Sequence, residues 1–178
     1  LCLLTTSFSN AQIVSATATS LNLANAAIYV DTADFVLVKK SATLLQHDIE
    51  MVTGKKPEIV NSLVPAVKNY IIIGTGGHSK LVDALAASGT ISLSSISNKW
   101  EAYLLQTINS SNAPKLLSKG ISALVISGSD RRGTAYGVFE LSKQIGVSPW
   151  YWWADVPVKK QSSIYINTSL KISDAPKV

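Results

Sequence analysis

The chain has 178 residues, of which 47% are hydrophobic and 15% are charged, a composition that suits one packed domain and excludes a disordered chain. Its net charge of +5 comes from basic residues scattered along the sequence, and the largest local groups are pairs such as Lys39-Lys40 and Arg131-Arg132. Nucleic-acid surfaces gather Lys and Arg on one face, so we expect no nucleic-acid partner. No run approaches the roughly 18 apolar residues of a membrane-spanning helix, so we expect no membrane partner.

The first residues have features of a secretory signal peptide. Residues 1–11 contain the apolar run Leu1-Cys2-Leu3-Leu4 and end with small residues at Ser9 and Ala11. We therefore predict a partial signal peptide over 1–11 and a secreted or periplasmic protein. The alternative is a short apolar N-terminal strand or arm. Cys2 is the only cysteine and lies in the segment to be removed, so the mature domain would hold no disulfide.

The first half of the chain alternates between strand and helix patterns. Residues 12–26 are rich in Ser, Thr, Ala and Asn and predict a loose lead-in. The elements expected next are a strand at 27–31, a helix from Asp34 or Ser41 to Gly54, a short strand at 57–60, a central strand at 70–73 and a helix over 79–88 closed by Gly89. The first helix has a predicted buried face of Val38, Leu44, Leu45, Ile49 and Val52.

The second half predicts a strand over 100–108, a polar turn region over 109–119, a strand at 121–126, a helix from Arg131 and a late strand at 164–166. The run Tyr70-Ile71-Ile72-Ile73 is apolar throughout, which is typical of a strand covered on both faces. The order of elements therefore predicts an α/β fold: a mixed β-sheet with about three helices.

The stretch from Ser127 to Val158 carries the most specific pattern. The sequence predicts Asp130 as the N-cap of a helix that starts at Arg131, because its carboxylate can accept hydrogen bonds from first-turn amides. Three glycines lack a Cβ and would allow the helix start and face to approach a neighbouring backbone closely: Gly128, Gly133 and Gly137. We assign this group a structural role as turn and cap.

Two runs in this stretch resemble a known family. The first is Gly128-Ser129-Asp130-Arg131-Arg132-Gly133-Thr134-Ala135-Tyr136-Gly137, and the second is Gly146-Val147-Ser148-Pro149-Trp150-Tyr151-Trp152-Trp153-Ala154-Asp155-Val156-Pro157. Both resemble the end of the N-terminal domain of glycoside hydrolase family 115, the xylan α-1,2-glucuronidases. The similarity extends upstream through 48–57, 71–75 and 99–101, so it covers most of the chain from about residue 27 onward.

This resemblance implies an organisation and a function. Residues 27–170 would be an N-terminal α/β accessory domain of the type that precedes glycosidase barrels, and 171–178 would begin a linker to a catalytic barrel. The family's catalytic residues belong to that barrel, so the chain would be a non-catalytic support of a secreted enzyme that removes 4-O-methylglucuronic or glucuronic acid from xylan. The implied partners are the barrel of the same polypeptide and, for the parent enzyme, xylan oligosaccharides.

The residues themselves offer no catalytic or metal constellation. Glycoside hydrolysis needs two carboxyl groups across the scissile bond. The candidate carboxylates each have a simpler role as strand-face charge, cap, helix surface or turn: Glu101, Asp130, Glu140 and Asp155. His47 and His78 stand apart from Cys, Asp or Glu at metal-binding spacing. We therefore predict no catalytic residue, no metal and no cofactor.

Two alternatives remain open. The glycine-rich run Gly74 to Lys80 follows a strand and opens a helix, which is the setting of phosphate-binding loops, but it fits neither the Walker nor the dinucleotide fingerprint. We interpret it as a structural turn capped by Ser79, with a phosphate- or nucleotide-binding α/β protein as the alternative. The aromatic cluster Trp150, Tyr151, Trp152 and Trp153 predicts either a buried or interdomain contact or the sugar-stacking platform of a free-standing carbohydrate-binding module.

Overall fold

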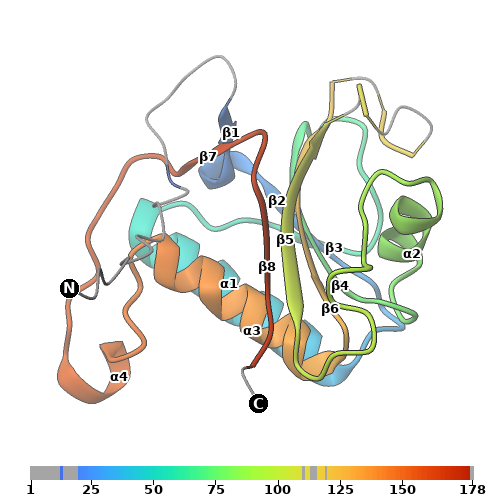
Figure 1. The fold of residues 1–178 in the computed structure, drawn as a ribbon. Helices are drawn as coiled ribbons and strands as arrows, with labels where there is room; N and C mark the ends of the chain where they lie inside the picture. The colour runs from blue at the N-terminus through green and yellow to red at the C-terminus, as the bar shows by residue number, and fades with distance from the viewer. Residues whose placement is uncertain (1–12, 14–19, 110, 113–115, 119, 177–178) are drawn as a thin grey trace, which may run out of the picture.

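The computed structural model describes residues 13, 20–109, 111–112, 116–118 and 120–176. Its centre is a six-stranded sheet in the order β3-β2-β4-β6-β5-β8 (Figure 1). The strands are β2 (Ala27–Val30), β3 (Ile59–Val60), β4 (Asn69–Thr75), β5 (Tyr103–Asn109), β6 (Ser122–Gly128) and β8 (Lys171–Asp174). Strands β3, β2, β4 and β6 run parallel, whereas β5 is antiparallel to both β6 and β8.

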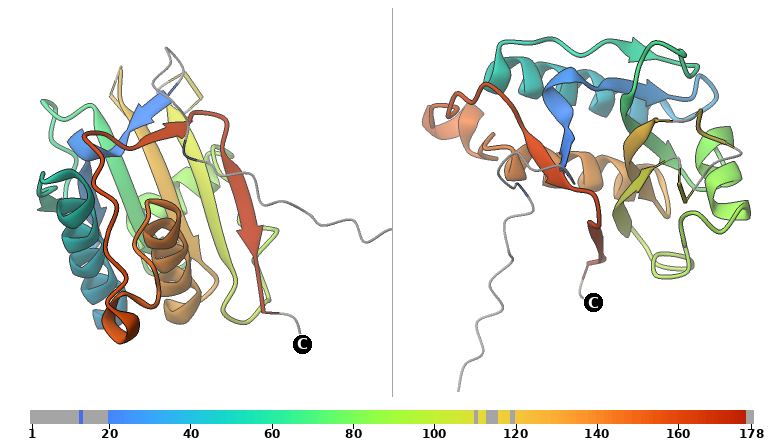
Figure 2. Two further views of the ribbon diagram at one scale, coloured as in Figure 1. Left: turned by 90° about the vertical axis from the view of Figure 1, so that its left-hand side faces the viewer. Right: turned by 90° about the horizontal axis from the view of Figure 1, so that it is seen from above.

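Helices cover both faces of this sheet. They are α1 (Val36–Thr53), α2 (Lys80–Ala87) and α3 (Arg131–Gln144), whereas the four-residue α4 (Tyr151–Ala154) lies outside these layers. Helices α1 and α3 lie side by side on one face and α2 lies on the other (Figures 1 and 2). The predicted α/β fold with a mixed sheet and about three helices is confirmed.

Strand β4 has apolar side chains on both of its faces, so both faces of the sheet must be covered by helices. Ile71 and Ile73 belong to the core beneath α1 and α3, whereas Tyr70 and Ile72 belong to the core beneath α2. This alternation follows from the two-residue repeat of a strand. Each of these side chains is fully buried, and burial of one such side chain contributes about 1.5–3 kcal/mol relative to exposure. Strand β4 therefore joins the two cores.

Residues 20–26 are not the loose lead-in that their composition predicts. They form strand β1 (Ser20–Asn22) and a 3-10 turn (Leu23–Asn25), and they bury Leu21 and Leu23. Strand β1 pairs with β7 (Tyr165–Asn167) in a separate two-stranded sheet. The pairing partner lies near the other end of the sequence, so local composition could not indicate it. The predicted signal peptide over 1–11 lies outside the described residues.

The C-terminal segment also differs from expectation. Residues 171–174 are not a linker but the edge strand β8, which pairs with β5 from Tyr103↔Asp174 to Gln106↔Lys171. Burial, followed by the charges of Glu140 and Asp174, raises the pKa of Tyr103 to about 12. The neutral Tyr103 hydroxyl is thus held beside the Asp174 carboxylate at the end of β8.

Two further expectations need correction. Leu44 was expected on the buried face of α1, but 45% of it is exposed, whereas Val38, Leu45, Ile49 and Val52 are fully buried. The strand expected from Trp100 begins only at Tyr103, which leaves Trp100 in the preceding loop. Within the described residues, no helix has both the length and the apolar character needed to cross a membrane.

Candidate functional site

The carboxyl ends of the parallel strands define the candidate site. Strands β2, β4 and β6 all end at one edge of the sheet, and the antiparallel β5 begins there. After β4 the chain enters α2 on one face, whereas after β6 it enters α3 on the other. A crevice forms where neighbouring connections leave to opposite faces, and open α/β sheets bind ligands at such a position.

The turn after β6 is built around Asp130. Its Oδ1 accepts hydrogen bonds from the amides of Arg132 and Gly133 at 2.8 Å each, and its Oδ2 accepts one from the amide of Glu101 at 2.8 Å. Asp130 therefore caps α3 and also ties it to the loop before β5. Burial by itself raises the pKa of Asp130, but the three amides and the charge of Arg132 outweigh it and lower the pKa below its usual value.

The glycines of this turn permit close backbone contacts. A Cβ at Gly133 would lie 2.2 Å from the carbonyl oxygen of Ala102, and a Cβ at Gly128 would lie 2.0 Å from the amide nitrogen of Thr134. A Cβ at Gly137 would lie 2.8 Å from the side chain of Ile126 in the sheet below. The absence of a Cβ at these glycines therefore lets the backbone of helix α3 lie directly against the start of β5.

The turn after β4, from Gly74 to Lys80, has its amides occupied by acceptors within the chain. The amide of Thr75 donates to Asp34 Oδ2 at 2.7 Å, and that of Lys80 donates to Asp31 Oδ2 at 3.0 Å. The other amide bonds run from Gly76 to the Gly128 carbonyl, from Gly77 to Asp83 Oδ1, and from His78 and Ser79 to the Thr75 carbonyl. A phosphate would have to displace these acceptors and meet two buried carboxylates, so the arrangement favours a structural turn.

Ser79 does not cap α2 as expected. It occupies the N-cap position, but its hydroxyl makes no capping hydrogen bond and is buried without a partner among the described residues. Asp31 replaces it as acceptor for the first helical amide, at Lys80. Hydrogen bonding from the Ala33 amide, with further help from Lys80 and Tyr29, lowers the pKa of Asp31 against the opposing effect of burial. The carboxylate therefore stays ionised where it braces the turn.

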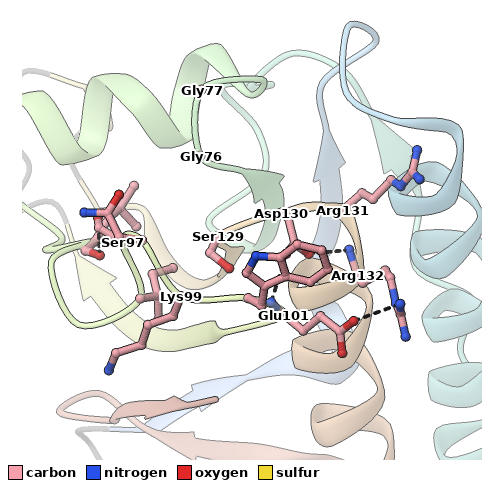
Figure 3. A pocket seen from close by; sticks show the side chains of 13 residues that line it. Gly76, Gly77, Ser97, Lys99, Glu101, Ser129, Asp130, Arg131 and Arg132 are labelled. Atoms are coloured by element: carbon pink, nitrogen blue, oxygen red, sulfur yellow. Dashed lines mark hydrogen bonds and ion pairs between the residues drawn. The ribbon is translucent and has the colours of Figure 1, made fainter. Parts of the chain in front are cut away.

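An open hollow of about 900 Å³ lies between these two turns and the loop before β5 (Figure 3). Its lining comprises Gly76, Gly77, Leu93, Ile96, Ser97, Asn98, Lys99, Trp100, Glu101, Ser129, Asp130, Arg131 and Arg132. Trp100 is 82% exposed, the largest exposure among the large hydrophobic side chains described. Its neighbours Asn98 and Glu101 hold left-handed backbone angles, with φ of 60° and 55°. Such strain in non-glycine residues is a feature of functional loops.

The charged side chains of the hollow differ in the groups that they contact. Figure 3 shows Glu101 and Arg132 pointing toward one another, and their side chains form an ion pair at 2.8 Å. Arg131 lies over the ring of Phe35, 6.0 Å from its centre, and Lys99 completes the basic side chains. The exposed indole offers a flat apolar face and the basic side chains can bind an anion, so the hollow suits a ring-shaped ligand that carries a negative charge. Both carboxylates of the hollow are already bound to groups of the chain.

The predicted aromatic cluster lies elsewhere. Trp150 is 66% exposed and directly precedes α4, which lies beyond the far end of α3 (Figure 1). Helix α3 has 14 residues, so its length of about 21 Å separates Trp150 from the edge that holds Trp100. Tyr151 is half-buried, and the side chains of Trp152 and Trp153 lie outside what the structure describes. In the described part of the chain, no group of His, Cys, Asp or Glu could hold a metal ion.

Sequence reasoning missed three residues of this edge. Asp31 and Asp34 follow directly after the buried strand β2, a position at which an acidic side chain faces the ends of the neighbouring strands. Trp100 carried no such signal, because Ala102 and Leu104 stand at strand spacing from it and include it in the predicted strand.

Comparison with known proteins indicates a domain related to glycoside hydrolases. No known family profile and no curated protein matches the chain. Among solved structures it is similar to a GH115 4-O-methyl-α-glucuronidase, BtGH115A, whose specificity is for decorated arabinogalactans. The identity is 32% and the TM-score 0.68, over 85% of this chain and 17% of that chain. A second similar structure, CpGH84D, has 10% identity and a TM-score of 0.50 over 85% of this chain and 21% of its own, and this likeness concerns the fold alone.

Proposed function

We propose that the chain is the non-catalytic N-terminal domain of an exported family 115 glycoside hydrolase and supports that enzyme's catalytic barrel. The observation that carries the proposal is the match to a GH115 glucuronidase at 32% identity over 85% of this chain. The chain spans only 17% of that much longer relative, as expected for one domain of a larger polypeptide. The sequence resemblance to family 115 points in the same direction independently of the fold.

The chemistry of the candidate site supports a non-catalytic role. A glycosidase needs a carboxyl group that stays protonated near neutral pH and a second, free carboxylate opposite it. In the hollow, the pKa of Asp130 is lowered, and its oxygens are bound by the amides of Arg132, Gly133 and Glu101. The Glu101 carboxylate pairs with Arg132. Both carboxylates of the hollow are held by other groups of the chain, and we therefore place the hydrolytic groups in another part of the polypeptide.

The proposed substrate is a polysaccharide that carries glucuronic acid or its 4-O-methyl derivative, with xylan as the first choice. The similar enzyme BtGH115A is specific for decorated arabinogalactans, so this second backbone must be tested beside xylan. The full polypeptide encoded by the gene should release the uronic acid from glucuronoxylan or from a glucuronate-decorated arabinogalactan. Absence of release from both polysaccharides by a folded full-length protein would contradict the proposal.

A second candidate function, carbohydrate binding by the domain itself, is favoured by Trp100. Its exposed indole lies in a hollow with Lys99 and Arg131, which together could hold a sugar ring and its carboxylate. Aldouronic oligosaccharides should then change the tryptophan fluorescence of the chain, and Trp100→Ala should abolish the change. The matched control is Trp150→Ala, because Trp150 is also exposed but lies beyond the opposite end of α3. If Trp150→Ala alone abolishes the change, the aromatic cluster is the sugar platform.

A further inference from the structure

The outer surface of the helical layer formed by α1 and α3 carries exposed apolar side chains. We define the outer helical strip as Leu37 and Leu44 of α1 with Tyr136 and Phe139 of α3. Leu44 is 45% exposed and Phe139 is 43% exposed, and Leu37 and Tyr136 are similarly accessible. On the other face of the sheet, α2 has no exposed large hydrophobic residue. The two helical covers of the same sheet therefore differ in what they present to their surroundings.

Part of the strip is concave. A groove of about 350 Å³ is lined by the apolar residues Leu44, Phe139, Val147 and Pro149 and by the polar residues His47, Asp48 and Ser148. Leu37 and Leu44 are seven residues apart and thus share one face of α1, and Tyr136 and Phe139 are neighbours on α3. Figure 2 shows the two helices side by side over the sheet. An apolar centre with a polar surround is the usual composition of a protein interface.

We infer that the outer helical strip is the surface on which this domain packs against the carbohydrate-cleaving part of its own polypeptide. This inference rests on the proposed function, because it takes the chain to be one domain of a longer enzyme. The matched segment makes up 17% of the similar glucuronidase chain, so most of such a polypeptide is available to cover a face of the domain. Because the strip is apolar, the partner is an apolar, folded surface in the rest of the polypeptide. This surface inserts a side chain between Leu44 and Phe139.

Hydroxyl-radical footprinting tests this packing directly, because it measures the oxidation of individual exposed side chains. Val64 is the matched internal control, since it is 38% exposed and lies outside the outer helical strip, where its backbone contacts the hydroxyl of Tyr70 from the core beneath α2. In the 178-residue chain, Leu44, Phe139 and Val64 should all be oxidised readily. In the full polypeptide encoded by the gene, oxidation of Leu44 and Phe139 should fall at least about fivefold, whereas that of Val64 should not change. Equal oxidation in the two proteins would overturn the inference.

Variants of the full polypeptide give a second readout. The double variant Leu44→Glu with Phe139→Glu should speed proteolytic separation of the domain several-fold, whereas Val64→Glu should leave the rate unchanged. Release of uronic acid by the same wild-type sample separates the two proposals. An active enzyme with an unprotected strip refutes only the packing surface, and an inactive protein with a protected strip refutes only the proposed function. A dimer of the 178-residue chain that Phe139→Glu dissociates would show that a second copy covers the strip and would also overturn the inference.

Discussion

The two glycine-rich turns at the carboxyl edge of the sheet resemble each other in sequence and differ in what their amides bind. In the turn after β4, the amides of Thr75 and Lys80 donate to Asp34 and Asp31, which belong to the segment after β2. In the turn after β6, Asp130 supplies the acceptor from within the turn and also holds the amide of Glu101. The amides of the first turn are occupied by carboxylates and carbonyls of the chain, and both turns line the hollow beside Trp100. Glycine spacing alone therefore indicates a tight turn without indicating a ligand.

Substitution of Gly133 should have the largest effect on stability, because this residue sets the contact between the second turn and β5. In Gly133→Ala the new methyl group would lie 2.2 Å from the carbonyl oxygen of Ala102, and backbone must move to relieve it. We expect a loss of about 3 kcal/mol in the free energy of unfolding, measured by urea denaturation. Gly77→Ala in the first turn is the control. Gly77 has φ of 78° but nothing near its Cβ, so strain alone should cost about 1 kcal/mol. Equal losses would contradict the close contact.

Removal of the Asp34 side chain should have the next largest effect. Asp34→Ala leaves the buried amide of Thr75 without its acceptor, and we expect a loss of about 2 kcal/mol. Asp83→Ala is the control within the same turn, because Asp83 accepts from the exposed amide of Gly77, which water can satisfy. Its cost should be about 0.5 kcal/mol. If urea denaturation gives the two variants the same stability, carboxylates do not brace this turn.

Lowering the pH should destabilise the protein through both turns, with a smaller effect than either substitution above. The pKa values of Asp31 and Asp130 are lowered in the folded protein, so the unfolded chain binds protons more readily at these positions. Their contribution is fully present above the unfolded pKa of about 3.9 and is lost as the pH falls through the lower folded values. Urea denaturation between pH 5 and pH 2 should show this decline, and Asp130→Asn should make it shallower. If the variant shows the same decline in stability as the wild-type protein, the amide partners of Asp130 do not stabilise its ionised carboxylate.

The parts of the fold that local sequence could predict are those fixed by local chemistry. The unbroken apolar run of β4 predicted a strand covered on both faces, and Asp130 before Arg131 predicted the start of a helix. The residues that escaped depend on partners far away in the chain. Strand β1 is defined by its pairing with β7, and the acceptor roles of Asp31 and Asp34 require β4 to lie beside β2.

The surface residues were the hardest to place. The periodicity of α1 assigned Leu44 to the core, because helical spacing alone does not distinguish the edge of a buried face from an exposed strip. Trp100 appeared to begin β5, but the left-handed backbone at Glu101 turns the chain before the strand starts and leaves the indole exposed. Both exposures follow from tertiary geometry, and both residues belong to the surfaces to which we assign contacts.

The proposed division of labour between this domain and a catalytic barrel can be tested most directly with the 178-residue chain itself. The purified chain should be incubated with glucuronoxylan oligosaccharides and glucuronate-decorated arabinogalactan under conditions in which the proposed full-length enzyme releases uronic acid. We predict no release by the chain alone, because Asp130 is held ionised and Glu101 is paired with Arg132. Release of uronic acid by the isolated chain, with loss of that release in Asp130→Asn or Glu101→Gln, would show that the hollow is itself an active site.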